Sequence, residues 1–262
     1  MTSPAIPPAF PSGVMLARDA WRLGVGAIRA MPNLFGGTFV LLLAFGLAFR
    51  WRHPPSDSWP SMSELLLGFA NSLAADVIAA AAIVAVHRSI LLGEGADRPF
   101  WQLPPGYDRY LGRMLVLSLP ILAGTVALGL FGQHEVTHAV VLAALILPLL
   151  GTVAVFVTMR LSLALPLAAA DVPGAGWRPA WKASRGKVWR LFGAVLLTYV
   201  PIEAAALLVA GLFRAEDGAA AVLLDVLGGA VMTLVSSAIG AALWSRLLQA
   251  YGGALARLPV WR

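Results

Sequence analysis

Six long apolar runs set the fold class of this chain. A helix of about 20 apolar residues crosses a hydrocarbon core roughly 30 Å thick. The runs that approach this length lie at about 33–49, 64–86, 110–131, 140–159, 191–213 and 219–244. The sequence therefore predicts an all-α polytopic transmembrane bundle of about six spans.

Composition supports the same class. Of 262 residues, 59% are hydrophobic and only 12% are charged, and the mean hydropathy is +0.80. Soluble domains carry about a quarter charged residues, so a single soluble core could not hide this much apolar surface. We expect residues 1–262 to form one membrane-embedded domain, with a Pro-rich, flexible N-terminus at 1–13.

The distribution of positive charge predicts the orientation in the membrane. If the chain crosses six times, all but three of its 19 Lys and Arg residues fall on one side. The exceptions are Arg50, Arg52 and Arg214. Cytoplasmic connections carry an excess of Lys and Arg, so both termini are predicted to be cytoplasmic. Since this charge lies in short connections between spans, the expected counter-charge is anionic lipid, and no nucleic acid partner is expected.

Segment 14–30 is predicted to be an amphipathic helix on the cytoplasmic membrane surface. Apolar residues recur there at helical spacing, and three arginines form a stripe beside them. The apolar positions are Val14, Ala17, Trp21, Val25 and Ile28, and the arginines are Arg18, Arg22 and Arg29.

Segment 177–190 is predicted to be a second interfacial segment. It mixes tryptophans, which favour the headgroup level, with cations, which favour anionic lipid. The tryptophans are Trp177, Trp181 and Trp189, and the cations are Arg178, Lys182, Arg185, Lys187 and Arg190. We interpret this basic segment as a contact for anionic lipid, for a protein partner or for a second copy of the chain. The alternative is that both interfacial segments are ordinary membrane anchors.

Three carboxylates lie inside predicted spans: Asp76, Glu203 and Asp225. Ionisable groups at such depth are costly and frequently functional. They could line a polar site that carries protons or cations, because no intramembrane cation is expected at equal depth. The alternative is that each accepts a hydrogen bond from a Ser, Thr or Asn on a neighbouring helix.

The sequence His134-Glu135-Val136-Thr137-His138 fits the HExxH pattern of zinc hydrolases. On a helix, His134 and His138 would share one face and bind zinc, with Glu135 as general base. The motif lies in a short connection on the predicted non-cytoplasmic side, and no third ligand follows at a recognisable spacing. We therefore favour a polar loop and assign no metal and no cofactor.

Two patterns link the even-numbered spans. Each ends in an arginine followed by aliphatic residues (Arg88, Arg160 and Arg246), as expected for a helical hairpin of about 80 residues used three times. Positive-inside topology alone would also produce much of this pattern. The second and sixth spans are rich in Ala, Gly and Ser, which let helices approach closely, so these two are predicted to form the centre of the bundle.

Three stretches carry a resemblance to a known family: RLSLALP at 160–166, AWKASRGKVWRLFG at 180–193 and VHRSILLGE at 86–94. Together they resemble stand-alone bacterial six-span proteins related to the membrane domain of some glycerophosphodiester phosphodiesterases. The resemblance implies a bacterial inner-membrane protein with cytoplasmic amphipathic segments. It implies no phosphodiesterase activity, because the soluble catalytic domain has no counterpart here.

These observations favour a non-enzymatic accessory or scaffold protein of the bacterial inner membrane. No Walker loop, Rossmann glycine fingerprint or GxSxG motif is present. Two alternatives stay open. The first is a small transporter that uses Asp76, Glu203 and Asp225, and the second is a zinc metallohydrolase centred on His134 and His138.

Overall fold

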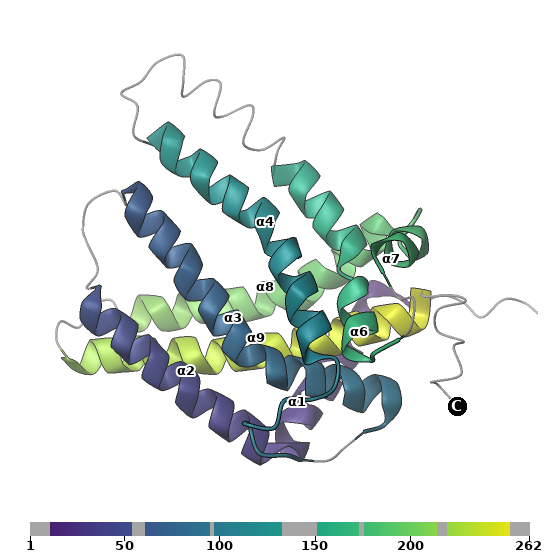
Figure 1. Ribbon diagram of the computed structural model, residues 1–262, viewed down its shortest axis with the longest axis horizontal. Coiled ribbons are helices and arrows are strands. Elements are labelled where there is room, and N and C mark those ends of the chain that lie inside the picture. Colours follow the sequence, from purple (N-terminus) through teal and green to yellow (C-terminus); the bar gives the residue numbers. More distant parts are fainter. Residues whose placement is uncertain are drawn as a thin grey trace, which may run out of the picture.

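The computed structural model describes residues 11–53, 61–94, 97–132, 151–172, 176–213 and 219–251, and within these ranges the regular structure is helical throughout (Figure 1). Among these described residues, six helices are long and apolar enough to cross a membrane, which confirms the predicted class of multi-pass helical protein. The spans are α2 (Pro32–Arg52), α3 (Met62–Leu92), α4 (Tyr107–Gly132), the fourth span Gly151–Ala169, α8 (Val188–Phe213) and α9 (Ala219–Tyr251). The shorter helices are α1 (Gly13–Ala30), α6 (Ala164–Ala169), which is the last part of the fourth span, and α7 (Trp177–Ala183).

Local sequence fixes where several of these helices begin and end. Ser61 and Glu64 form a reciprocal capping box at the start of α3. Gly93 ends the same helix with φ of 69°, a left-handed conformation that favours glycine. At the start of α2, the Asp97 carboxylate accepts hydrogen bonds from the backbone N–H groups of Asn33 and Leu34 at 3.2 and 3.3 Å.

The fourth span is interrupted near its end. Its helical backbone breaks at Ser162 and resumes at Ala164 as α6. Pro166 accounts for the break, because its ring clashes with the carbonyl four residues earlier, which belongs to Ser162. Arg113 of α4 donates a hydrogen bond of 2.6 Å to the Ala164 carbonyl just after this break.

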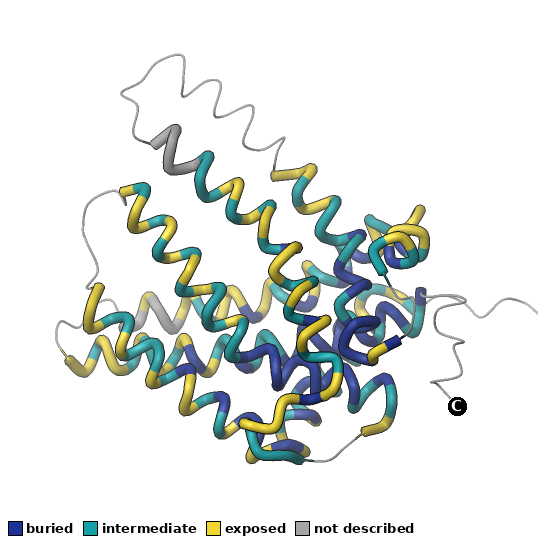
Figure 2. Tube along the Cα trace, viewed as in Figure 1, coloured by how far each residue is buried: buried dark blue, intermediate teal, exposed yellow. Residues whose placement is uncertain are grey.

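The buried core gathers at one end of the bundle, where α1 and α6 lie (Figure 2). It contains the second half of α3, the second half of α9 and the first half of α2. The other halves of these helices are more exposed, and there α3 diverges from α2 and α9 (Figure 1). Helix α9 packs against α1, α2, α3, α6 and α8, which agrees with the predicted central position of the second and sixth spans.

Helix α1 lies against the bundle through a stripe of mostly small residues. Its buried positions are Leu16, Ala17, Ala20, Gly24 and Ala27. Only Ala17 belongs to the apolar face predicted from the sequence; Val14 is 64% exposed, and Trp21, Val25 and Ile28 are half-buried. The buried face is therefore rotated from the expected one, because α9 accepts small side chains more closely than large ones. The placement of α1 at a membrane surface stays a prediction.

Candidate functional site

The arginines at the ends of the even-numbered spans each hold a neighbouring segment in place. Arg88 forms a bidentate ion pair with Glu94 at 2.6 and 2.7 Å and donates to the Ala169 carbonyl at 3.1 Å. It therefore ties the end of α3 to α6. Its side chain is only 10% exposed, which strengthens these charged hydrogen bonds.

Arg160 positions α7. It donates to the Trp181 carbonyl at 2.6 Å and to the Ser184 hydroxyl at 3.2 Å, and its guanidinium lies 3.7 Å from the centre of the Trp181 ring. A stacked, buried guanidinium of this kind fixes both the position and the rotation of the short helix.

Arg246 joins α9 to α1 through an ion pair with Asp19 at 2.8 Å. Arg109 of α4 likewise pairs with Asp171, which follows α6. Asp19, Glu94 and Asp171 lie at the buried end of the bundle. Each of these three carboxylates is therefore already paired with an arginine that joins two segments. The arginines near the ends of spans two, four and six, which are Arg88, Arg160 and Arg246, thus each join their span to a neighbouring helix.

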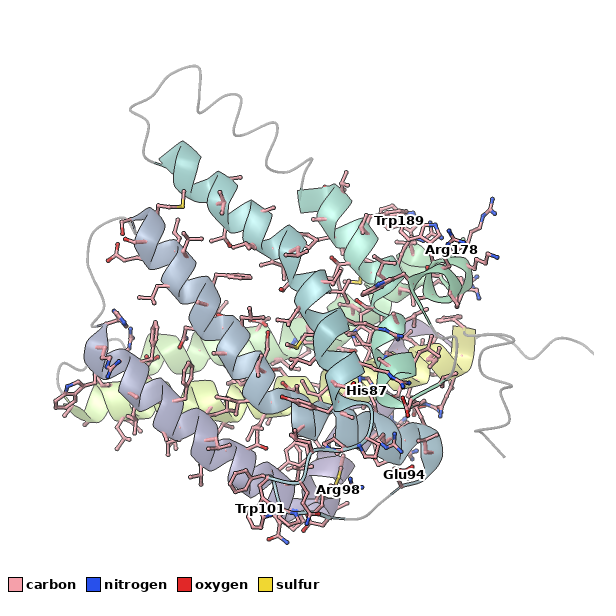
Figure 3. All side chains as sticks on the ribbon, viewed as in Figure 1. His87, Glu94, Arg98, Trp101, Arg178 and Trp189 are labelled. Atoms are coloured by element: carbon pink, nitrogen blue, oxygen red, sulfur yellow. The ribbon has the colours of Figure 1, made fainter. Side chains whose placement is uncertain are left out.

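The cations of α7 and the following turn are placed differently. Arg178, Lys182 and Arg185 are exposed, and none of their three side chains has an ion pair or hydrogen bond in the part of the chain that the structure describes. Trp181 is 37% exposed and Trp189 is 84% exposed. We call these five residues the basic tryptophan surface; Figure 3 labels Arg178 and Trp189, which project from the same side of the bundle.

Lys187 and Arg190, the remaining predicted cations, border this surface. Lys187 is half-buried, donates a 2.9 Å hydrogen bond to the Tyr251 carbonyl and lies 5.5 Å from the centre of its ring. Burial, and to a smaller extent repulsion from Arg190, lowers the pKa of Lys187 below 10.5. Lys187 therefore belongs to the packing between α8 and α9, whereas Arg190 is exposed beside the surface.

One of the three predicted intramembrane carboxylates has a cationic partner. Asp225 pairs with Arg50 at 2.8 Å, so the expectation that no cation lies at its depth is wrong. Helix α2 extends to Arg52, and this longer helix brings Arg50 beside α9. Asp76 of α3 and Glu203 of α8 have no ion pair in the part of the chain that the structure describes.

A buried polar pair near the core was not predicted. His87 Nδ1 lies 2.8 Å from the Ser245 hydroxyl, and the His87 ring lies 5.8 Å from that of Tyr110. His87 and Ser245 are at most 1% exposed, so this hydrogen bond joins α3 to α9 inside the protein. In the sequence, His87 is only a histidine at the end of an apolar run. Such histidines are common next to membrane spans, so this position did not indicate a buried hydrogen bond.

The HExxH motif, with His134, Glu135 and His138, lies outside the described residues. Within the described ranges, no three His, Asp or Glu side chains are grouped so that they could hold a metal ion.

The fold defines a multi-pass helical membrane protein with a buried, arginine-fastened end that carries an exposed basic surface. Comparison with protein-family models, with curated proteins and with solved structures finds no match to this chain.

Proposed function

We propose that this protein is a non-enzymatic scaffold of the bacterial cytoplasmic membrane, with both termini in the cytoplasm, and that its basic tryptophan surface binds anionic lipid headgroups. The observation that carries the proposal is the exposure of Arg178, Lys182 and Arg185 beside Trp189. Cations near a membrane surface gain about 1 kcal/mol each from anionic lipid, and tryptophan favours the same level.

The fixed position of α7 supports this role. Arg160 holds the helix through two hydrogen bonds and a stacked ring, so the exposed cations project from a rigid base. Rigid placement reduces the entropy lost when a headgroup binds. Asp19, Glu94 and Asp171 are already paired with other arginines, so they do not neutralise the surface internally.

A fluorescence experiment can test the proposal because the chain contains no cysteine. Gly176 precedes α7, and a side chain added there would meet nothing within 4 Å, so Gly176→Cys offers a unique labelling position. The labelled protein is reconstituted in phosphatidylcholine vesicles with increasing phosphatidylglycerol. We expect the probe emission to shift as the anionic fraction rises, and to shift less at high salt.

Charge reversal of Arg178, Lys182 and Arg185 to Glu should abolish that shift. The matched control reverses Arg18, Arg22 and Arg29 on α1, which changes the net charge equally and leaves the surface intact. A shift that survives the first triple variant, or that both variants lose equally, would contradict headgroup binding at this surface.

Transport is the second candidate function, because Asp76 and Glu203 lie within the spans α3 and α8 and have no ion pair among the described residues. In proteoliposomes with an internal pH dye, the transport reading expects a protein-dependent proton flux that Asp76→Asn abolishes and Asp225→Asn, at the separate ion pair, retains. Equal flux in the wild type and the Asp76→Asn variant would remove Asp76 from the mechanism.

A further inference from the structure

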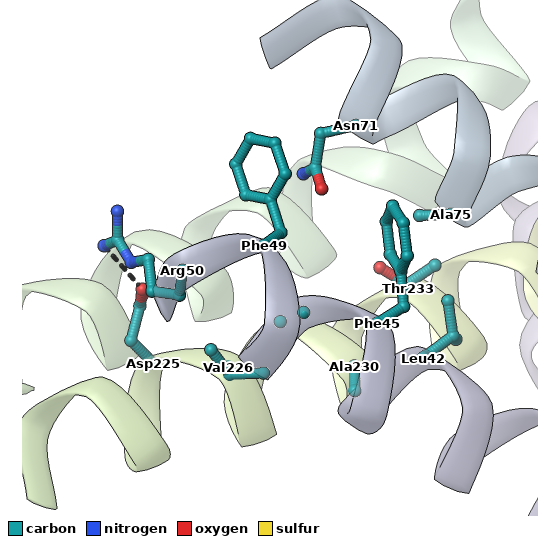
Figure 4. A pocket seen from close by; sticks show the side chains of 12 residues that line it. Leu42, Phe45, Phe49, Arg50, Asn71, Ala75, Asp225, Val226, Ala230 and Thr233 are labelled. Carbon is teal, nitrogen blue, oxygen red and sulfur yellow. Dashed lines mark hydrogen bonds and ion pairs between the residues drawn. The ribbon is translucent and has the colours of Figure 1, made fainter. Parts of the chain in front are cut away.

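A cleft of about 330 Å³ opens between α2, α3 and α9 in the half of the bundle where α3 diverges from α2 and α9 (Figure 4). Its apolar wall includes Leu42, Phe45 and Phe49 of α2 and Val226 of α9. The cleft is formed by membrane-spanning helices and borders the core at Leu42 and Ala230, and none of its lining residues belongs to the basic tryptophan surface.

Four polar side chains are set into this apolar cleft: Arg50, Asn71, Asp225 and Thr233. Asp225 and Thr233 are eight residues apart on α9, so the polar groups extend over about 12 Å of helix. Asn71 lies on α3, across from the phenylalanines of α2 (Figure 4). Mostly apolar walls with a few placed polar groups are typical of ligand sites.

Two of these residues carry buried atoms without a partner. Within the described ranges, Arg50 Nε and Asn71 Oδ1 are two of only three buried side-chain nitrogen or oxygen atoms with no hydrogen bond. An unpaired buried polar atom costs about 1–3 kcal/mol. Arg50 Nε is a hydrogen-bond donor and Asn71 Oδ1 is an acceptor. After a small displacement of both side chains, a single ligand with one acceptor and one donor would pair with both atoms.

The remaining donors of Arg50 favour an anionic ligand. Asp225 holds Arg50 through one hydrogen bond of 2.8 Å, and Arg52 follows two residues later with an exposed side chain. This single contact leaves the Arg50 guanidinium with donors for a phosphate.

We propose that this cleft binds a single-chain phospholipid, with its phosphate at Arg50, its acyl chain along the phenylalanine wall and its free glycerol hydroxyl donating to Asn71. The membrane supplies such amphiphiles laterally, and the cleft is built within the spans. A two-chain phospholipid lacks the free hydroxyl on the acylated glycerol, and a monoacylglycerol lacks the phosphate, so each tests one half of the recognition. The headgroup hydroxyls of phosphatidylglycerol are shared with its single-chain form and therefore do not contribute to the comparison.

The experiment uses the full chain purified in a non-ionic detergent and titrated with each lipid, with occupancy measured by native mass spectrometry. Lysophosphatidylglycerol should bind one molecule per chain, about tenfold tighter than monoacylglycerol or phosphatidylglycerol. Arg50→Gln should weaken lysophosphatidylglycerol binding about tenfold, whereas the matched variant Arg52→Gln, outside the cleft lining, should bind like the wild type. Asn71→Leu should remove the preference over phosphatidylglycerol.

Asp225→Asn separates binding from structural support. Both Arg50→Gln and Asp225→Asn break the ion pair, but only Asp225→Asn frees the guanidinium, so it should tighten lysophosphatidylglycerol binding. If it weakens binding as Arg50→Gln does, the ion pair is structural and the proposal is wrong. Equal binding of monoacylglycerol by the wild type would identify an apolar groove without phosphate recognition, and no binding of any lipid would also overturn the proposal.

Discussion

Replacement of Gly24 by alanine tests whether α1 is docked on the bundle. A Cβ atom at Gly24 would lie 2.8 Å from Ile239 Cα and 2.9 Å from its backbone nitrogen. Backbone atoms cannot rotate away as a side-chain tip can, so α1 would have to move from α9. Gly26 lies on the exposed side of the same helix, and a Cβ atom there would meet nothing within 4 Å.

When the stabilities of Gly24→Ala and Gly26→Ala are compared, the contribution of helix propensity cancels. In a helix interior, Gly→Ala stabilises by about 0.5–1 kcal/mol, and overpacking costs about 1–3 kcal/mol. Gly26→Ala should therefore stabilise the protein slightly. The difference between the two variants should equal the overpacking cost of about 1–3 kcal/mol, which corresponds to about 2–12 °C in Tm at 2–4 °C per kcal/mol.

Thermal unfolding followed by circular dichroism, with both variants in the same detergent, provides the assay. Gly24→Ala should melt below Gly26→Ala, with the same helical content before melting. If Gly24→Ala melts at or above Gly26→Ala, α1 does not pack on Ile239, and a helix lying free on the membrane surface would be the better description.

Three further predictions concern the buried end and the orientation. Arg160→Lys should destabilise the protein by about 2–3 kcal/mol and speed tryptic cleavage around α7, because lysine cannot reproduce the stacked, forked contact; Arg178→Lys should change stability by less than about 0.5 kcal/mol. Because the folded pKa of Lys187 is lowered, the unfolded chain binds more protons between that pKa and 10.5. Stability should therefore rise with pH across this window, and thermal melts of Lys187→Gln should show a smaller rise. In intact cells, an impermeant maleimide should label Trp51→Cys, whose position is 90% exposed, and should label Gly176→Cys only after permeabilisation; the reverse pattern would contradict the proposed orientation.

The number of spans and much of their extent could be predicted from the sequence. Apolar length is a local property, and a run of about 20 such residues has few alternatives to a membrane-spanning helix. The second, fourth and sixth spans extend past the ends of their predicted apolar runs, since α3 reaches Leu92, the fourth span reaches Ala169 and α9 reaches Tyr251. Caps such as Ser61 with Glu64 are equally local.

The roles of individual charges could not be predicted in this way. Arg88, Arg160 and Arg178 are the same residue type near the same end of the bundle, yet the first two fasten helices and the third is exposed. Arg50 and Asp225 are 175 positions apart, so no local pattern joins them.

The amino-acid sequence by itself determined that this chain forms six apolar helices with its positive charge gathered between alternate pairs. The tertiary structure decided which face of α1 is buried, which arginines are engaged and where a polar cleft opens. The physical reason is that these features depend on the rotation and closeness of neighbouring helices. Close approach at small residues such as Gly24 and Gly240 sets both.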